Sequence, residues 1–140
     1  MTTEENKALY RRMLEAINHK DLAAAEALMA PDAVNHSPLP GEPPGVEGFR
    51  YRMGVIFAAF PDIHFTTEAM IAEGDKVCTR GTMAGTNTGP FMGMPPTGKR
   101  VTVTYIDILR VAEGKFVVHW AQLDQLGMMQ QLGAIPARGA

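Results

Sequence analysis

Asp107 is the residue of this chain best suited to acid/base chemistry, because it lies in an apolar segment, Tyr-Ile-Asp-Ile-Leu. Hydrophobic surroundings disfavour the charged form of a carboxyl group, which suits it to exchanging a proton near neutral pH. Side chains alternate along a strand, so Tyr105 and Asp107 should face a cavity, where Tyr105 would contact a substrate. Ile106 and Ile108 should then pack against the helices or a partner. We predict that Asp107 is a catalytic base.

A second carboxylate, Asp124, ends the last predicted strand and is also a candidate catalytic base. It could reach the mouth of the cavity, or it could cap the helix that begins near Leu126, since aspartate is favoured at N-caps. Asp107 likewise has a structural alternative, which is an ion pair with Arg80 or Arg110. Arg80 could instead stabilise an enolate or a carboxylate of the substrate.

Asn35, His119 and Trp120 are further candidates for contact with a substrate. Asn35 could donate a hydrogen bond to a substrate carbonyl. The position of His119 has the opposite parity to those of Trp120 and Asp124. These three side chains therefore cannot all face inward unless a β-bulge interrupts the strand.

Other patterns argue against a metal or nucleotide site. The segment Gly93-x4-Gly98-Lys99 approaches a phosphate-binding loop, but Arg100 follows where magnesium binding requires Ser or Thr. We therefore expect no nucleotide cofactor. We also expect no zinc or iron site, because the histidines show no spacing typical of metal ligands: His19, His36, His64 and His119.

Composition and charge are those of a small folded protein. The 140 residues suffice for one domain, and the 13 basic and 15 acidic residues form no basic block that would favour nucleic acid. Apolar runs are too short to cross a bilayer, and the first residues lack the apolar core of a signal peptide. A single cysteine, Cys78, is typical of a reducing compartment, so the expected location is the cytoplasm.

Helices come first in the predicted order and long strands follow, which indicates an α+β fold. A strongly bent antiparallel sheet would wrap around the N-terminal helices as a cone and enclose one apolar pocket, in a single domain over residues 1–140. The predicted helices are one that begins at Thr2 with capping-box spacing, 22–30 ended by Pro31, 46–59, and 126–132 ended by Gly133; the predicted strands are 62–72, 76–86, 99–111 and 115–124.

The loop from Asn87 to Gly98 is longer than a hairpin requires and carries three large apolar residues, Phe91, Met92 and Met94. It could be a lid over the pocket, a plug at one end of the sheet or a dimer contact. The ten methionines of the chain also allow two interpretations. They could form a pliable pocket wall or fill an ordinary core.

Several segments together resemble the SnoaL-like polyketide cyclase family, within the nuclear-transport-factor-2-like cone-fold superfamily. The resemblance covers nearly the whole chain and is most specific in its middle part. The segments that carry it are Gly85-Thr-Asn-Thr-Gly89, Phe91-Met-Gly-Met-Pro-Pro-Thr-Gly98, Ile106-Asp-Ile-Leu-Arg110, Glu113-Gly-Lys115, His119-Trp120 and Gln131-Leu-Gly133.

This resemblance implies an intramolecular aldol reaction that closes a ring in a polyketide ester without metal or cofactor. A carboxylate would remove a proton next to a carbonyl, and neighbouring donors would hold the enolate. Asn35 matches the family, whose acid/base aspartate falls at or near Ala121. Asp107 and Asn87 stand where the family has histidines, so Asn87 is another candidate substrate contact.

The expected function is therefore a cofactor-independent acid/base enzyme for a small hydrophobic carbonyl compound, by cyclase, lyase or isomerase chemistry. A non-catalytic module that binds such a molecule is the first alternative. Epoxide hydrolysis is the second, and it would require Asp107, Arg80 and Asp124 to lie together. We also predict a homodimer through the outer face of the sheet, where Thr102, Thr104 and Ile106 would leave an uncovered patch.

Overall fold

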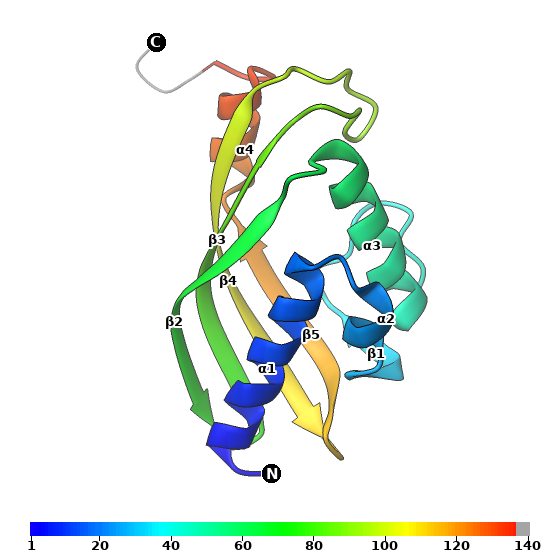
Figure 1. Cartoon of the computed structure of the whole chain (residues 1–140), viewed down its shortest axis with the longest axis vertical. Coiled ribbons are helices and arrows are strands. Elements are labelled where there is room, and N and C mark those ends of the chain that lie inside the picture. The colour runs from blue at the N-terminus through cyan, green and yellow to red at the C-terminus, as the bar shows by residue number, and fades with distance from the viewer. Residues whose placement is uncertain (137–140) are drawn as a thin grey trace.

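One five-stranded sheet and four helices make up the computed structural model, which describes residues 1–136 (Figure 1). Residues 137–140 of the predicted single domain lie outside the described part. The elements in chain order are α1 (Thr3–Asn18), α2 (Leu22–Glu26), β1 (Met29–Asn35), α3 (Val46–Ala59), β2 (His64–Glu73), β3 (Lys76–Thr86), β4 (Arg100–Ala112), β5 (Lys115–Leu123) and α4 (Gln125–Leu132).

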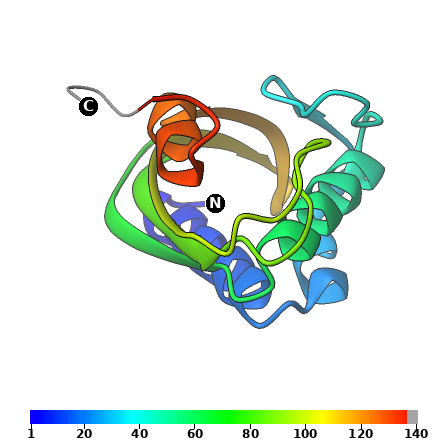
Figure 2. The same ribbon diagram turned by 90° about the horizontal axis from the view of Figure 1, so that it is seen from above.

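The sheet has the strand order β1-β5-β4-β3-β2 and bends strongly around the helices. Seen from above, it curves around an open centre, with α1 and α3 on its concave side and α4 at one end (Figure 2). The predicted α+β cone is therefore confirmed. Strands β2 to β5 pair in antiparallel fashion, as predicted, but β1 pairs with β5 in parallel.

Strand β1 is an element that the sequence reasoning missed. The predicted helix 22–30 is wrong in its second half, because α2 ends at Glu26 and the first strand of the sheet begins at Met29. Pro31 was interpreted as a helix end, yet it lies inside β1. Proline is tolerated there because β1 is an edge strand, whose outer amide positions need no partner. The last residue of β1, Asn35, pairs with His119 of β5.

The apolar residues of the helices pack against the concave face of the sheet. In α1, Leu9, Met13 and Ile17 are buried, and they meet Phe49 of α3 and Phe116 of β5 in one cluster. Burying each side chain of this size contributes about 1.5–3 kcal/mol, so this packing largely determines how α1 and α3 lie on the sheet. No helix among residues 1–136 is long and apolar enough to span a membrane.

Helix α4 covers the end of the sheet that β5 leaves open. Strand β5 stops at Leu123, opposite Tyr105, so the backbone of β4 at Thr102 has β3 on one side but no strand on the other. The side chain of Gln131 replaces that neighbour: its Oε1 accepts a hydrogen bond from Thr102 N–H at 2.7 Å, and its Nε2 donates to Thr102 C=O at 2.9 Å. Gly133 ends the helix with a left-handed φ of 82°, as predicted.

Candidate active site

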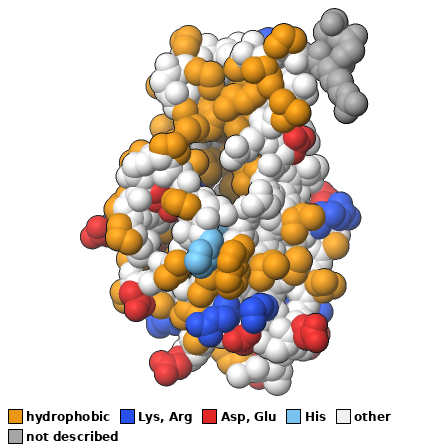
Figure 3. Space-filling view, turned by 180° about the vertical axis from the view of Figure 1, so that it is seen from behind, with side chains coloured by type: hydrophobic (Ala, Val, Ile, Leu, Met, Phe, Trp, Pro, Cys, Tyr) orange, Lys and Arg blue, Asp and Glu red, His pale blue; other side chains and the backbone are white. Residues whose placement is uncertain are grey.

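A cavity of about 650 Å³ lies between the concave face of the sheet and the helices. This volume is within the range of small-molecule sites. The view from behind shows hydrophobic side chains gathered around a hollow in the upper half of the molecule (Figure 3). Most of the lining is apolar and comes from α1, α3, α4, all five strands, and the loops around residues 36–40 and 91–92. The predicted apolar pocket between sheet and helices is therefore confirmed.

Asp107 lines this cavity with only 8% of its surface exposed. Tyr105 lies on the same face of β4, whereas Ile106 is 53% exposed on the outer face. The predicted inward direction of Tyr105 and Asp107 is therefore confirmed. Of the two predicted surroundings of Ile106, the helices are wrong, because they cover only the concave face of the sheet, whereas contact with a partner stays a prediction.

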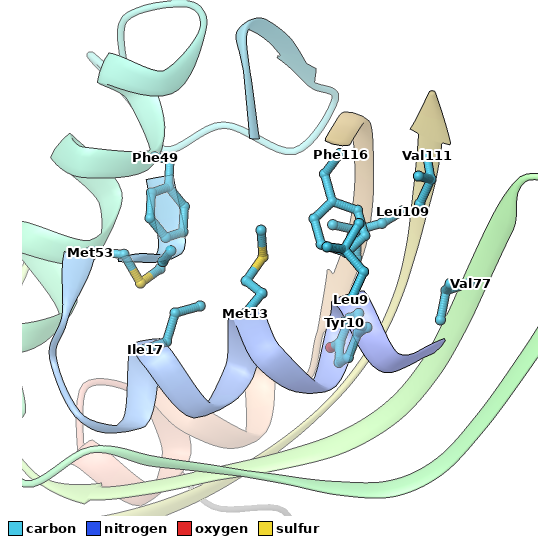
Figure 4. Close-up of a cluster of buried hydrophobic side chains, with 11 residues drawn as sticks. Leu9, Tyr10, Met13, Ile17, Phe49, Met53, Val77, Leu109, Val111 and Phe116 are labelled. Atoms are coloured by element: carbon cyan, nitrogen blue, oxygen red, sulfur yellow. The ribbon is translucent and has the colours of Figure 1, made fainter. Parts of the chain in front are cut away.

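Tyr10 of α1 donates its hydroxyl hydrogen to Asp107, with its oxygen 3.2 Å from each carboxylate oxygen. Burial raises the pKa of Tyr10, and the nearby charge of Asp107 raises it further, so the phenol stays neutral and remains a donor. Figure 4 shows Tyr10, Met13 and Ile17 along α1, with Met13 pointing between Phe49 and Phe116. The Tyr10 hydroxyl thus holds the Asp107 carboxylate in place within a cavity wall that is otherwise mostly apolar.

His119 is the second partner of Asp107. Its Nε2 lies 3.4 Å from Asp107 Oδ2, and its Nδ1 lies 3.2 Å from Oδ1 of Asn35. His119 lines the cavity, whereas its neighbour Trp120 does not. As their opposite parity predicts, the side chains of His119 and Trp120 do not both face the cavity.

Asn35 is held by two further side-chain contacts at the end of β1. Its Nδ2 donates to Glu42 Oε2 at 2.9 Å, and its Oδ1 accepts from Ser37 N–H at 3.0 Å. Glu42 in turn accepts from Arg52 Nη1 of α3 at 2.9 Å. The side chains of this ion pair are only 2% (Glu42) and 14% (Arg52) exposed. A chain of polar contacts thus leads from α3 through β1 to His119 and Asp107.

Tyr105 places a buried hydroxyl next to the cavity wall. Its ring lies over Gly81 of β3, where a Cβ atom would collide with the phenol. The hydroxyl is buried and, among the described residues, has no hydrogen-bond partner. Burial raises the pKa of Tyr105 to about 12, with the charge of Asp107 as the second cause, so the phenol keeps its proton. The residue lines the cavity, but its hydroxyl oxygen is buried behind the cavity surface.

Three predicted site residues lie away from the cavity wall. Asp124 is exposed and caps α4, with its Oδ1 accepting from Gly127 N–H at 2.9 Å. Arg80 is exposed, and Trp120 stacks on His36 with ring centres 5.3 Å apart. The structure therefore supports the capping alternative for Asp124. The Asp-Arg-Asp arrangement that epoxide hydrolysis would require is not formed.

The alternative of a structural ion pair for Asp107 is also wrong. Arg110 contacts Asp75 at 3.5 Å, and the basic side chain that reaches Asp107 is His119. Within the described part of the chain, neither a lysine nor an arginine pairs with Asp107. Among residues 1–136, no three or more His, Cys, Asp or Glu side chains gather as metal ligands.

Asn87 is fully buried but holds the long loop rather than lining the cavity. Its Nδ2 donates to the carbonyls of Ala59 and Gly89, and its Oδ1 accepts from Thr97 N–H at 2.9 Å. Phe91 packs edge-on against Phe60 with ring centres 5.5 Å apart. The loop lies at one end of the sheet, and its Phe91 and Met92 line the cavity, so both the plug and the lid remain predictions.

Methionines form part of the cavity lining, which fits the predicted pliable wall. Met13, Met29, Met53, Met83, Met92, Met128 and Met129 contribute to it, whereas Met94 packs behind the wall. Met92 stands at the tip of the long loop and is 49% exposed. Thioether side chains adapt to ligands of irregular shape, so this wall can accommodate a large aromatic molecule.

Sequence reasoning missed Tyr10, Ser37, Glu42 and Arg52. Only Tyr10 carries a signal that could have been used, because it shares the helical spacing of Met13 and Ile17 on the buried side of α1. Ser37 and Glu42 lie in a Pro-rich loop without periodicity, and the partner of Glu42 lies 10 residues away in α3.

The comparison with known families gives a clear match. The model of the SnoaL-like polyketide cyclases matches residues 7–132 of this chain. The chain belongs to this family. A similar curated protein is the aklanonic acid methyl ester cyclase DnrD of Streptomyces peucetius, which is 33% identical over 131 residues, covering 89% of this chain and 88% of that protein.

Solved structures with similar sequences have the same fold as this SnoaL-like chain. TsrD of Streptomyces laurentii is 30% identical with a TM-score of 0.88, and the match covers 96% of this chain and 99% of that one. IdmH of Streptomyces antibioticus is 37% identical with a TM-score of 0.80, and the match covers 91% of this chain and 98% of that one. These likenesses extend over nearly the whole described chain.

Proposed function

We propose that this protein is a cofactor-independent cyclase that closes a ring in a polyketide ester by an intramolecular aldol reaction. The observation that carries the proposal is Asp107, a nearly buried carboxylate in an apolar cavity, placed between Tyr10 and His119. Membership of the SnoaL-like family and the likeness to the ester cyclase DnrD support the same reaction class.

In the proposed mechanism, the Asp107 carboxylate removes a proton from the carbon next to a substrate carbonyl. The C–H electron pair becomes part of an enolate, whose oxygen requires a hydrogen-bond donor among the polar residues of the cavity wall. The enolate carbon then bonds to a second carbonyl carbon of the same molecule. The oxygen of that carbonyl takes up the proton that Asp107 removed, so substrate and product are isomers.

The apolar wall supports this chemistry in two ways. It excludes water that would compete for the enolate, and it holds a flexible substrate in the folded shape that ring closure requires. The cavity residues Phe49, Phe60 and Phe91 provide aromatic surface for a polyketide. The same surface would serve a binding module, which is the alternative function.

Incubation with the methyl ester of aklanonic acid, the compound in the name of DnrD, tests the proposal. Liquid chromatography with mass spectrometry should show a new isomer of unchanged mass with the native protein and little of it with Asp107→Asn. The methyl ester of nogalonic acid, named in a 28% identical relative from Streptomyces nogalater, is a second probe. Tight binding of both without any isomer would instead favour the binding module.

A further inference from the structure

We propose that Glu42 and Arg52 are positioning residues, which act through Asn35 to keep a proton on Nδ1 of His119. Their contact with the site is indirect, because Glu42 reaches His119 only through the amide of Asn35. The catalytic consequence of this arrangement rests on the proposed function, whereas the placement of the proton rests on the hydrogen bonds alone.

The orientation of the Asn35 amide follows from its two outer partners. The Ser37 backbone N–H can only donate, so the amide atom 3.0 Å from it must be the oxygen. The Glu42 carboxylate can only accept, so the atom 2.9 Å from it must be the nitrogen. Both partners exclude the flipped amide, and Oδ1 therefore faces His119.

Glu42 is itself kept as an acceptor by the groups around it. It receives hydrogen bonds from Arg52 Nη1 at 2.9 Å and from Leu39 N–H at 3.3 Å, in addition to that from Asn35. Arg52 also lies over the ring of Phe49 at 5.7 Å, which limits where its guanidinium group can go. A buried carboxylate with three donors and a paired cation has no hydrogen to give to Asn35.

The consequence for His119 is a fixed pattern of donors. Because Oδ1 of Asn35 can only accept, Nδ1 of His119 must carry a hydrogen at their 3.2 Å contact. Nε2 is then the nitrogen that faces Asp107, at 3.4 Å from Oδ2. An unprotonated Nε2 and an ionised carboxylate would both be acceptors, so one shared proton completes this contact. Because the His119 ring is fixed, this proton stays beside the Asp107 carboxylate.

Nuclear magnetic resonance of the protein with 15N-labelled histidine tests the protonation pattern directly. We expect a protonated Nδ1 for His119 in the native protein at the pH at which turnover is measured. Glu42→Leu combined with Arg52→Leu removes both charges and leaves neither one buried without its partner. This double variant should lose the preference for Nδ1 protonation and lower kcat roughly tenfold with little change in KM.

Two controls separate positioning from general damage. Glu42→Gln retains an acceptor oxygen and should keep both the native Nδ1 signal and most of kcat. Glu26→Leu with Arg50→Leu removes another Glu–Arg pair, which joins α2 to α3 with an Nε–Oε1 distance of 2.8 Å and lies outside the cavity lining. It should leave the His119 signal and kcat unchanged.

An unprotonated Nδ1 in the native protein would overturn the proposal. So would a folded Glu42→Leu/Arg52→Leu variant with the native signal and native kcat. If that variant does not fold, Asn35→Leu removes the acceptor of Nδ1 directly, and an unchanged His119 signal in it would likewise refute the proposal. Absence of turnover in the native protein would count against the proposed cyclase alone, because the resonance of Nδ1 is observed without substrate.

Discussion

Asp107 on β4 lies directly opposite Ala121 on β5, as cross-strand partners. Both residues line the cavity. The family resemblance places the acid/base aspartate at or near Ala121, where this chain has a methyl group. Directly opposite residues of an antiparallel pair have their Cβ atoms about 4.5–5.5 Å apart. A carboxylate at 107 can therefore serve nearly the same region of the cavity as one at 121.

Replacing Asp107 by Asn should abolish most of the proposed turnover. The amide keeps the shape of the side chain but cannot take a proton, so the rate should fall roughly a hundredfold or more while ligand affinity stays nearly intact. Initial rates and the quenching of protein fluorescence by the ester measure the two quantities. Asp124→Asn provides the matched control, because Asp124 caps α4 outside the cavity lining. Equal loss in both variants would contradict the assignment of Asp107.

Moving the carboxylate across the strand pair should restore part of that loss. Asp107→His alone removes the base, whereas Asp107→His combined with Ala121→Asp returns a carboxylate to the opposite position on the same face. The double variant should turn over roughly tenfold faster than Asp107→His, because proton removal depends first on where the carboxylate lies. Steady-state kinetics of the two variants decide the matter. A double variant no faster than Asp107→His would show that position 121 cannot serve the substrate.

Period-two alternation made much of this site predictable. The direction of Tyr105 and Asp107 follows from strand parity, and the opposite parity of His119 and Trp120 correctly predicts that they do not both face inward. The partner of Asp107, Tyr10, lies 97 residues earlier in the chain, and nothing local to either residue encodes their meeting. Only the packing of α1 on the sheet brings them together.

The polar contacts around Asn35 were unpredictable for a different reason. A proline at position 31 is compatible both with the end of a helix and with an edge strand, and the neighbouring residues do not distinguish the two. The wrong choice concealed β1 and with it the pairing of Asn35 with His119. Glu42 was concealed because an irregular loop gives no periodic signal of burial.

Tyr10→Phe should weaken both the fold and the proposed reaction. The substitution removes the hydroxyl that donates to both oxygens of Asp107 and leaves a buried carboxylate short of a donor. A hydrogen bond to a charged group is worth about 1.5–3 kcal/mol, and this is the expected drop in the free energy of unfolding. Urea denaturation measures it, with Tyr51→Phe at an exposed tyrosine as control. Equal stability of the two variants would rule out a contribution from this hydrogen bond.

Alkaline pH should destabilise the protein in part through Tyr105. Its pKa rises from 10.0 to about 12 in the folded state, which means that the folded chain holds this proton more tightly than the unfolded chain. Stability from this source is complete below pH 10.0 and is lost as the pH rises toward about 12. Urea midpoints across that window should fall less steeply in Tyr105→Phe than in the native protein. A slope unchanged by the substitution would exclude this linkage.

We propose that the outer face of the sheet forms a homodimer, and Ile106 is the residue that tests it. Ile106 is 53% exposed on β4, and the neighbouring Thr102 and Thr104 of the same face are also exposed. A bent sheet with helices on one side leaves such a face to water unless a partner covers it. Ile106→Glu would bring like charges together across a two-fold interface and should shift the mass by light scattering from dimer to monomer. Leu126→Glu alters a residue of α4 that is 62% exposed and lies off the sheet, so it should leave the dimer intact. A native protein that is monomeric at micromolar concentration, or a dimer that persists in Ile106→Glu, would refute this interface.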